Sequence, residues 1–115
     1  MLYCVPESAS AMFETLDPVR LQELCASSKP PALLDVRSAQ EFARGSIVGA
    51  RHVDLGALSN VVDELDPHAP IVLICMSGAR SAQGCQYLAQ RGFTRLYNLG
   101  GGLASWACHG LPFTA

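Results

Sequence analysis

One cysteine, Cys75, stands where a run of apolar residues meets a loop of small polar ones. The sequence reads "IVLIC" at 71–75 and "MSGARS" at 76–81. A cysteine at this place can act as a nucleophile when its surroundings favour the thiolate. Small residues such as Ser77 and Ala79 let successive backbone N–H groups point inward and form a nest for an anion. The stretch therefore indicates either a nucleophile in an anion-binding loop or a core cysteine followed by an ordinary turn.

The residues that follow would stabilise a negative charge on Cys75 in further ways. Gly78 permits backbone angles that other residues avoid and allows a ligand to approach closely. A helix that begins near Arg80 or Ser81 would direct free N–H groups and the positive end of its dipole at the loop. Arg80 adds the only basic side chain of the loop. We therefore expect the pKa of the Cys75 thiol to be lowered.

Short apolar runs alternate with helical patterns along the chain, and these elements must position the loop. Strands are predicted at 32–36 ("ALLDV"), 50–55 ("ARHVDL"), 71–75 and 95–99 ("RLYNL"). This alternation predicts a single α/β domain with a central parallel sheet of about five strands and helices on both faces. Ligands of such sheets bind beyond the carboxyl ends of the strands, where Cys75 is placed.

The helices are predicted from capping signals and apolar spacing. Asp17 is an N-cap followed by Pro18 at the first helical position. Ser38 and Glu41 form a capping box for a short helix at 38–44. Further helices are expected at 58–65, in the segment between the cysteine loop and Gly92, and around Trp106.

Composition limits the possible functions. The chain has 115 residues, of which half are hydrophobic and 16% are charged, and this suits one domain, 13–115, after an N-terminal extension, 1–12. The net charge of -2 gives no reason to expect nucleic acid or a membrane surface as a partner. No apolar run is long enough for a membrane span, and the start resembles no secretory signal, so we expect a cytoplasmic protein. The five cysteines include no Cys-x-x-Cys pair, so we predict neither a disulfide framework nor a metal site.

Three motifs in one order give the chain a family resemblance. They are "LLDVRSAQEFARGSIVGA" at 33–50, "CMSGARS" at 75–81, and "LGGGLASW" followed by "GLP" at 99–112. They resemble the D-V-R-x-x-x-E-[FY], C-x-x-G-x-R-[SA] and L-x-G-G-x-x-x-W…G-x-P signatures of the rhodanese-like domains. The resemblance covers roughly residues 13 to 113, which is nearly the whole chain.

The resemblance implies a sulfurtransferase that needs no cofactor. In this family a cysteine thiolate takes a sulfane sulfur from thiosulfate or a persulfide and becomes a persulfide itself. A thiophilic acceptor, which is cyanide, a thiol or a protein thiolate, then removes the outer sulfur. The expected partners are thus a small sulfur-containing anion and, in addition, a possible protein donor or acceptor. The predicted catalytic residue is Cys75, supported by Asp35 and Arg37. The predicted binding loop consists of Met76, Ser77, Gly78, Ala79, Arg80 and Ser81.

Two other functions compete with sulfur transfer. Some rhodanese-like domains are non-enzymatic carrier or regulatory modules, but these have often lost the cysteine that this chain retains. Dual-specificity phosphatases that share the fold have five residues between cysteine and arginine. Here four residues separate Cys75 from Arg80. The shorter loop makes a pocket for sulfur rather than phosphate, which disfavours a phosphatase or an arsenate reductase.

Some individual residues also have more than one possible role. Arg80 could bind the anionic end of the donor or fix the loop, and we favour donor binding slightly. Ser46 stands where the family often has histidine, which would remove a polar group. Cys85 is expected to be buried in a helix, whereas Cys108 could resolve the persulfide only if the fold brings it near the loop.

Overall fold

Five short strands form one parallel sheet in the computed structural model, which describes residues 13–114. The strands are β1 (Glu14–Leu16), β2 (Ala32–Asp35), β3 (Arg51–His52), β4 (Ile71–Ile74) and β5 (Leu96–Leu99). Their order across the sheet is β1-β5-β4-β2-β3, and every neighbouring pair is parallel. The central strand is therefore β4, the strand that leads into Cys75. The extension assigned to 1–12 lies outside the described residues.

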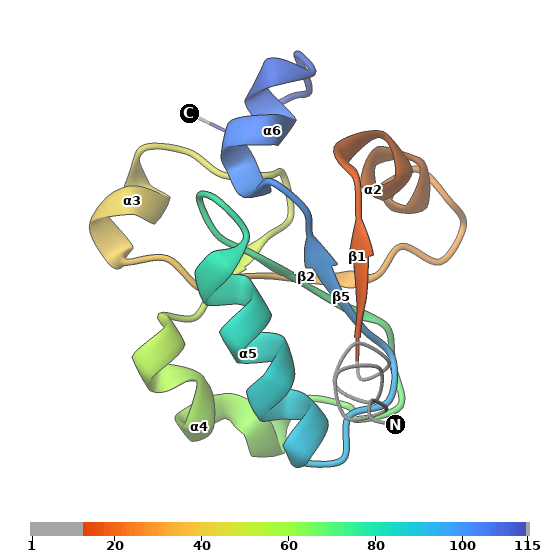
Figure 1. Ribbon diagram of the computed structural model, residues 1–115, viewed down its shortest axis with the longest axis vertical. Coiled ribbons are helices and arrows are strands. Elements are labelled where there is room, and N and C mark those ends of the chain that lie inside the picture. The colour runs from red at the N-terminus through yellow and green to blue at the C-terminus, as the bar shows by residue number, and fades with distance from the viewer. Residues whose placement is uncertain (1–12, 115) are drawn as a thin grey trace, which may run out of the picture.

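Helices connect the strands and cover both faces of the sheet (Figure 1). The described residues form the α-helices α2 (Pro18–Cys25), α3 (Ala39–Ala43), α4 (Leu58–Val61), α5 (Ala79–Gln90) and α6 (Gly102–Cys108). The Asp17 carboxylate accepts from the Arg20 N–H at 2.8 Å, and Ser38 and Glu41 form a reciprocal capping box. The predicted α/β architecture and both helix starts are confirmed. None of the described helices is long and apolar enough to cross a membrane.

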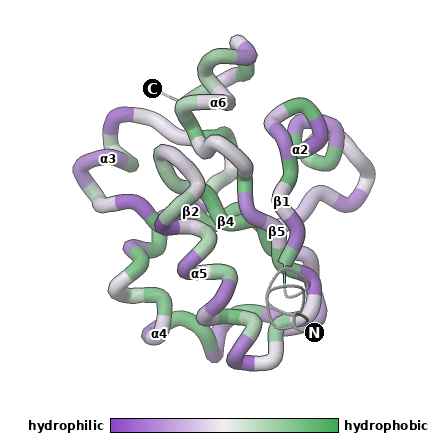
Figure 2. Tube along the Cα trace, viewed as in Figure 1, coloured by the Kyte–Doolittle hydropathy of each residue, from purple (hydrophilic) through white to green (hydrophobic). Residues whose placement is uncertain are grey.

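Two apolar clusters lie on opposite faces of the sheet because side chains alternate along each strand. On one face, Leu34 and Leu73 pack with Leu88 of α5. On the other face, Val72 and Ile74 pack with Trp106 of α6. All four residues of β4 are buried, and the hydrophobic colouring follows β4 through the centre of the molecule (Figure 2). Burial of such a side chain contributes about 1.5–3 kcal/mol, so β4 is anchored from both sides.

Three elements differ from the sequence predictions. β1 was not predicted, because only Leu16 of its three residues is buried and so short a strand shows no pattern. The strand predicted at 50–55 ends at His52, since the Asp54 carboxylate accepts from the Gly56 N–H at 2.9 Å and turns the chain. The helix predicted at 58–65 is divided, because α4 tightens into a 3-10 turn at Val62–Glu64.

Candidate active site

Cys75 follows β4 directly, at the carboxyl edge of the sheet. The start of α6 lies beside the loop that precedes α5 (Figure 1). Its Leu103 N–H donates to the Cys75 carbonyl at 2.9 Å, and its Ala104 N–H donates to the Met76 carbonyl at 3.0 Å. Gly102, with φ +61°, permits this contact, since a Cβ there would collide with both carbonyl oxygens. The loop carbonyls are thus bound outward, which leaves the loop N–H groups free to face inward.

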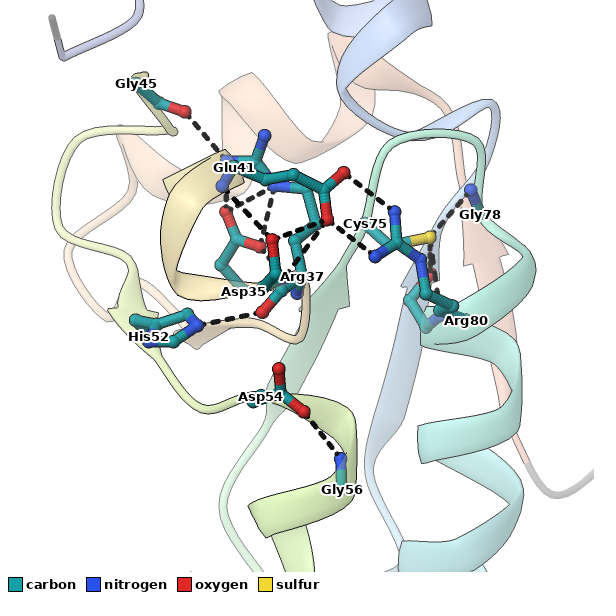
Figure 3. Close-up of polar contacts among 12 residues, drawn as sticks. Asp35, Arg37, Glu41, Gly45, His52, Asp54, Gly56, Cys75, Gly78 and Arg80 are labelled. Atoms are coloured by element: carbon teal, nitrogen blue, oxygen red, sulfur yellow. Dashed lines mark hydrogen bonds and ion pairs between the residues drawn. The ribbon is translucent and has the colours of Figure 1, made fainter. Parts of the chain in front are cut away.

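The Cys75 sulfur lies inside a set of hydrogen-bond donors (Figure 3). The Gly78 N–H donates to Sγ at 3.0 Å and the Ser81 N–H donates to it at 3.4 Å. The Ser81 hydroxyl oxygen is 3.3 Å from the same sulfur. These contacts form the type of cradle that a thiolate or a persulfide anion requires.

The ionisation of Cys75 reflects a balance between burial and these donors. Burial raises the pKa of the Cys75 thiol, but the hydrogen bonds from the Ser81 hydroxyl and from the N–H groups of Ser81, Gly78 and Ser77 outweigh it. The net pKa is lowered, as expected from the sequence. Cys85 shows the opposite case, because burial without such donors raises its pKa to about 12. Of these two buried cysteines, only Cys75 is prepared to be an anion.

Gly78 determines how α5 begins. It is the N-cap with φ +97°, and a Cβ there would lie 3.3 Å from the Leu99 carbonyl oxygen. A side chain at this position would be strained by the backbone angle and by this contact. Because α5 begins at Ala79, its first N–H groups and the positive end of its dipole face the sulfur. The helix predicted to begin near Arg80 or Ser81 thus begins at Ala79, one or two residues earlier.

Arg80 points to Glu41 of α3. The guanidinium makes two contacts with the carboxylate, Nη1 to Oε1 at 2.7 Å and Nη2 to Oε2 at 3.0 Å. The hydrogen bond from Arg80, together with the one from the Ser38 N–H, lowers the pKa of Glu41 to about 2. Glu41 therefore has two functions, as capping residue of α3 and as partner of Arg80, and the sequence revealed only the first. The two contacts connect the loop to α3, as expected if Arg80 fixes the loop. Donor binding by Arg80 stays a prediction.

Asp35 and Arg37 form a buried ion pair beside the loop. The register pairs Asp35 of β2 with Ile74 of β4, which places both motifs at one sheet edge. Arg37 Nη2 is 2.7 Å from Asp35 Oδ2, and the side chains are 3% and 0% exposed. Arg37 Nη2 also donates to the Gly45 carbonyl at 2.7 Å. The pair contacts the chain between α3 and β3 rather than the Cys75 sulfur, and its supporting role in the site stays a prediction.

Ser46 is a polar member of this cluster, contrary to the expectation that it removes one. Its hydroxyl donates to Asp35 Oδ2 at 2.6 Å, and its N–H donates to Thr114 Oγ1 at 3.1 Å. The Thr114 N–H donates back to the Ser46 carbonyl at 2.8 Å. A serine here therefore connects Asp35 to the C-terminal segment.

Asn98 of β5 completes the surroundings of Cys75, and sequence reasoning missed it. Its side chain is almost fully buried, and it contacts both the Ser81 hydroxyl and the Gly78 carbonyl. The available signal was a polar residue within the apolar strand "RLYNL", since a buried amide needs partners.

A pocket of about 400 Å³ adjoins the loop at Met76. Most of its lining is apolar, and Arg44 brings a positive charge without an ion-pair partner among residues 13–114. Its walls are Arg37, Glu41, Arg44, Gly45, Met76, Leu103, Ala104, Ala107, Phe113 and Thr114. The Cys75 side chain is fully buried and does not line this pocket, whereas the neighbouring Met76 is 42% exposed.

Cys85 and Cys108 lie outside the cysteine loop. Cys85 is buried in α5, as expected, and Cys108 is exposed at the end of α6. No hydrogen bond joins Cys108 to the loop among the described residues, and a resolving role stays a prediction. Within residues 13–114, no group of three or more His, Cys, Asp or Glu side chains could hold a metal ion.

Comparison with known proteins identifies the family of the chain. The model of the rhodanese-like domain matches residues 17–109. A sulfurtransferase from Allochromatium vinosum is 36% identical over 104 residues, which are 90% of this chain and 97% of that protein. A thiosulfate sulfurtransferase GlpE from Ectopseudomonas mendocina is 36% identical over 94 residues, covering 82% of this chain and 84% of that protein.

A solved structure agrees with the sequence matches. The crystal structure of SSP1007 from Staphylococcus saprophyticus superimposes with a TM-score of 0.77 and 31% identity, covering 86% of this chain and 98% of that one. The matched region contains every residue of the cysteine loop and of the Asp35–Arg37 pair. The chain therefore belongs to the rhodanese-like domain family, with sulfurtransferases among its relatives.

Proposed function

We propose that the protein transfers sulfane sulfur through a persulfide on Cys75. The single observation that carries this proposal is the placement of the Cys75 sulfur within 3.4 Å of two backbone N–H groups and the Ser81 hydroxyl. These donors lower the pKa of the thiol, so more thiolate is present at neutral pH than for a free cysteine. The names of the relatives, sulfurtransferase and thiosulfate sulfurtransferase, favour the same chemistry.

The reaction divides into two displacements at sulfur. First, the Cys75 thiolate attacks the outer sulfur of thiosulfate, a bond forms between Sγ and that sulfur, and the S–S bond of the donor breaks to release sulfite. Second, cyanide or a thiolate attacks the outer sulfur of the Cys75 persulfide and regenerates the Cys75 thiolate. Each step moves one sulfur atom with its charge balanced, and the N–H groups of the loop stabilise the anion between the steps.

The pocket suggests a second class of donor, an organic persulfide that carries a carboxylate. Two basic side chains line the pocket, and Arg37 is bound to Asp35, so Arg44 is the one without an ion-pair partner among the described residues. A volume of about 400 Å³ exceeds the needs of thiosulfate but suits a small organic molecule with an apolar body. In this case the thiolate of the organic molecule leaves in place of sulfite.

The test is an intact mass measured without reductant after incubation with thiosulfate or glutathione persulfide. We expect a gain of one sulfur atom in the wild type and in Cys85→Ser, the matched control for a buried cysteine, but not in Cys75→Ser. Cyanide should then remove the added sulfur as thiocyanate. The absence of an adduct with every donor would overturn the proposal, and rapid hydrolysis of p-nitrophenyl phosphate would favour a phosphatase instead.

A further inference from the structure

Asn98 of β5 makes two hydrogen bonds to the cysteine loop. Its Nδ2 donates to the Gly78 carbonyl at 3.1 Å, and its Oδ1 accepts a short hydrogen bond from the Ser81 hydroxyl. The same Ser81 oxygen is 3.3 Å from the Cys75 sulfur. Asn98 thus contacts Gly78 and Ser81, two residues whose N–H groups donate to the sulfur, although it does not touch the sulfur itself.

The orientation of the Asn98 amide follows from these partners. A carbonyl oxygen only accepts hydrogen bonds, so the NH₂ end must face Gly78 and the oxygen end must face Ser81. The Gly78 carbonyl also accepts a hydrogen bond from the Ala82 N–H at 3.2 Å, which fixes this carbonyl at the first turn of α5. Asn98 can therefore act toward Ser81 only as an acceptor.

The Ser81 hydroxyl has one proton and two neighbours that can accept it. When Cys75 is a thiol, the proton goes to Asn98, and the Ser81 oxygen accepts the S–H. When Cys75 is a thiolate, the sulfur needs the same proton, and the hydroxyl must turn away from Asn98. The stability of the anion therefore depends on the competition between Asn98 and the sulfur.

We propose that Asn98 is a positioning residue that holds the Ser81 hydroxyl beside Cys75 and withholds part of its hydrogen bond from the anion. This arrangement stabilises the Cys75 thiolate less than full donation by the Ser81 hydroxyl would. The thiolate is then a stronger nucleophile, because nucleophilicity falls as the thiol becomes more acidic. The proposal rests on the proposed function in treating Cys75 as the reactive anion. A direct titration of the thiolate tests it without any sulfur transfer.

The charged groups around the sulfur are already paired and stay unchanged in the test. Arg80 of α5 is bound to Glu41 of α3, and Asp35 at the end of β2 is bound to Arg37. Neither β5 nor α6 contributes a charged side chain. A change in the titration after substitution of Asn98 therefore reports on Ser81.

The experiment follows the ultraviolet absorbance of the Cys75 thiolate against pH, with Cys75→Ser as the baseline for the other cysteines. Ser81→Ala should reduce the thiolate fraction below the midpoint about tenfold, because it removes a hydrogen bond to a charged group. Asn98→Ala should raise this fraction about threefold, because the Ser81 proton becomes available to the sulfur. The double variant should match Ser81→Ala, since Asn98 acts through Ser81.

Two outcomes would overturn the proposal. One is an Asn98→Ala protein whose thiolate fraction is unchanged or reduced. The other is an equal effect of Asn98→Ala with and without Ser81, which would show action by another route. Asn98→Leu, which keeps the branching and the number of heavy atoms of the side chain, replaces Asn98→Ala if the alanine variant does not fold. A lower melting temperature alone would not produce the dependence on Ser81. Sulfur loading that fails in all proteins with a normal titration would contradict the proposed function and leave this inference standing.

Discussion

Arg80 and Glu41 are joined by two guanidinium–carboxylate contacts of 2.7 and 3.0 Å, across 39 positions of sequence. One residue belongs to the cysteine loop and the other to α3, so the pair fastens two of the motifs that define the family. A cation bound in this way is poorly placed to serve as the main binding group for an incoming anion.

The Arg80–Glu41 pair predicts matched kinetic losses. Arg80→Gln and Glu41→Gln should each lower kcat/KM for thiosulfate and cyanide by about threefold, because the pair is partly exposed and such pairs are worth less than about 1 kcal/mol. The double variant should lose little more than either single one. A loss of a hundredfold or so in Arg80→Gln alone would instead indicate direct binding of the donor.

Glu41 also predicts how the fold responds to acid. Its pKa is lowered from 4.5 to about 2, so it contributes stability that is complete above about pH 4.5 and is lost as the pH falls toward 2. Urea unfolding of the wild type should therefore lose more free energy between pH 5 and about 2 than that of Glu41→Gln. Parallel curves for the two proteins would contradict this assignment. Substitution of Glu64, whose ion pair with Arg51 is more exposed, provides the control.

The buried Asp35–Arg37 pair predicts a large loss of stability when one partner is removed. Asp35→Asn leaves the Arg37 guanidinium buried without its counter-charge, which should reduce the free energy of unfolding by about 3–5 kcal/mol. Asp54→Asn, at an exposed capping carboxylate after β3, should cost about 1 kcal/mol or less. Equal midpoints of urea unfolding for the two variants would show that Asp35 has no such structural role.

The pocket predicts that donors can be separated by one substitution. Ala107→Trp fills part of the apolar wall, so sulfur loading from glutathione persulfide should fall about tenfold while loading from thiosulfate changes by less than about twofold. Ala43→Trp, on an exposed position of α3 outside the pocket lining, should change neither rate. If Ala107→Trp slowed sulfur loading equally from both donors, the pocket would not be the binding site for the organic persulfide.

The parts of the fold that sequence predicted are those with strong local signals. The β4 strand is apolar throughout because it is covered on both faces, and the caps at Asp17 and Ser38 are visible in a few residues. β1 escaped prediction because its place depends on pairing with β5, not on its own three residues. Its pairing partner lies more than 80 positions away, and no local pattern encodes such a distance.

The same limit applies to the candidate site. The sequence order of Cys75, Gly78 and Ser81 predicted the cradle because all three belong to one turn. The contacts of Ser46 and Asn98 depend on how separate strands align, so they became visible only in the folded chain. Polar residues at otherwise buried positions were the one sign of them.

Gly102 has a consequence for protein engineering. The absence of a side chain there lets α6 begin against the carbonyls of Cys75 and Met76, so the shape of the loop is moulded partly by a segment 27 positions later. A loop transplanted alone into another scaffold would lose these backbone contacts with the start of α6. Chimeras that exchange reactivity between relatives should therefore carry the glycine turn together with the cysteine segment, as a single discontinuous cassette.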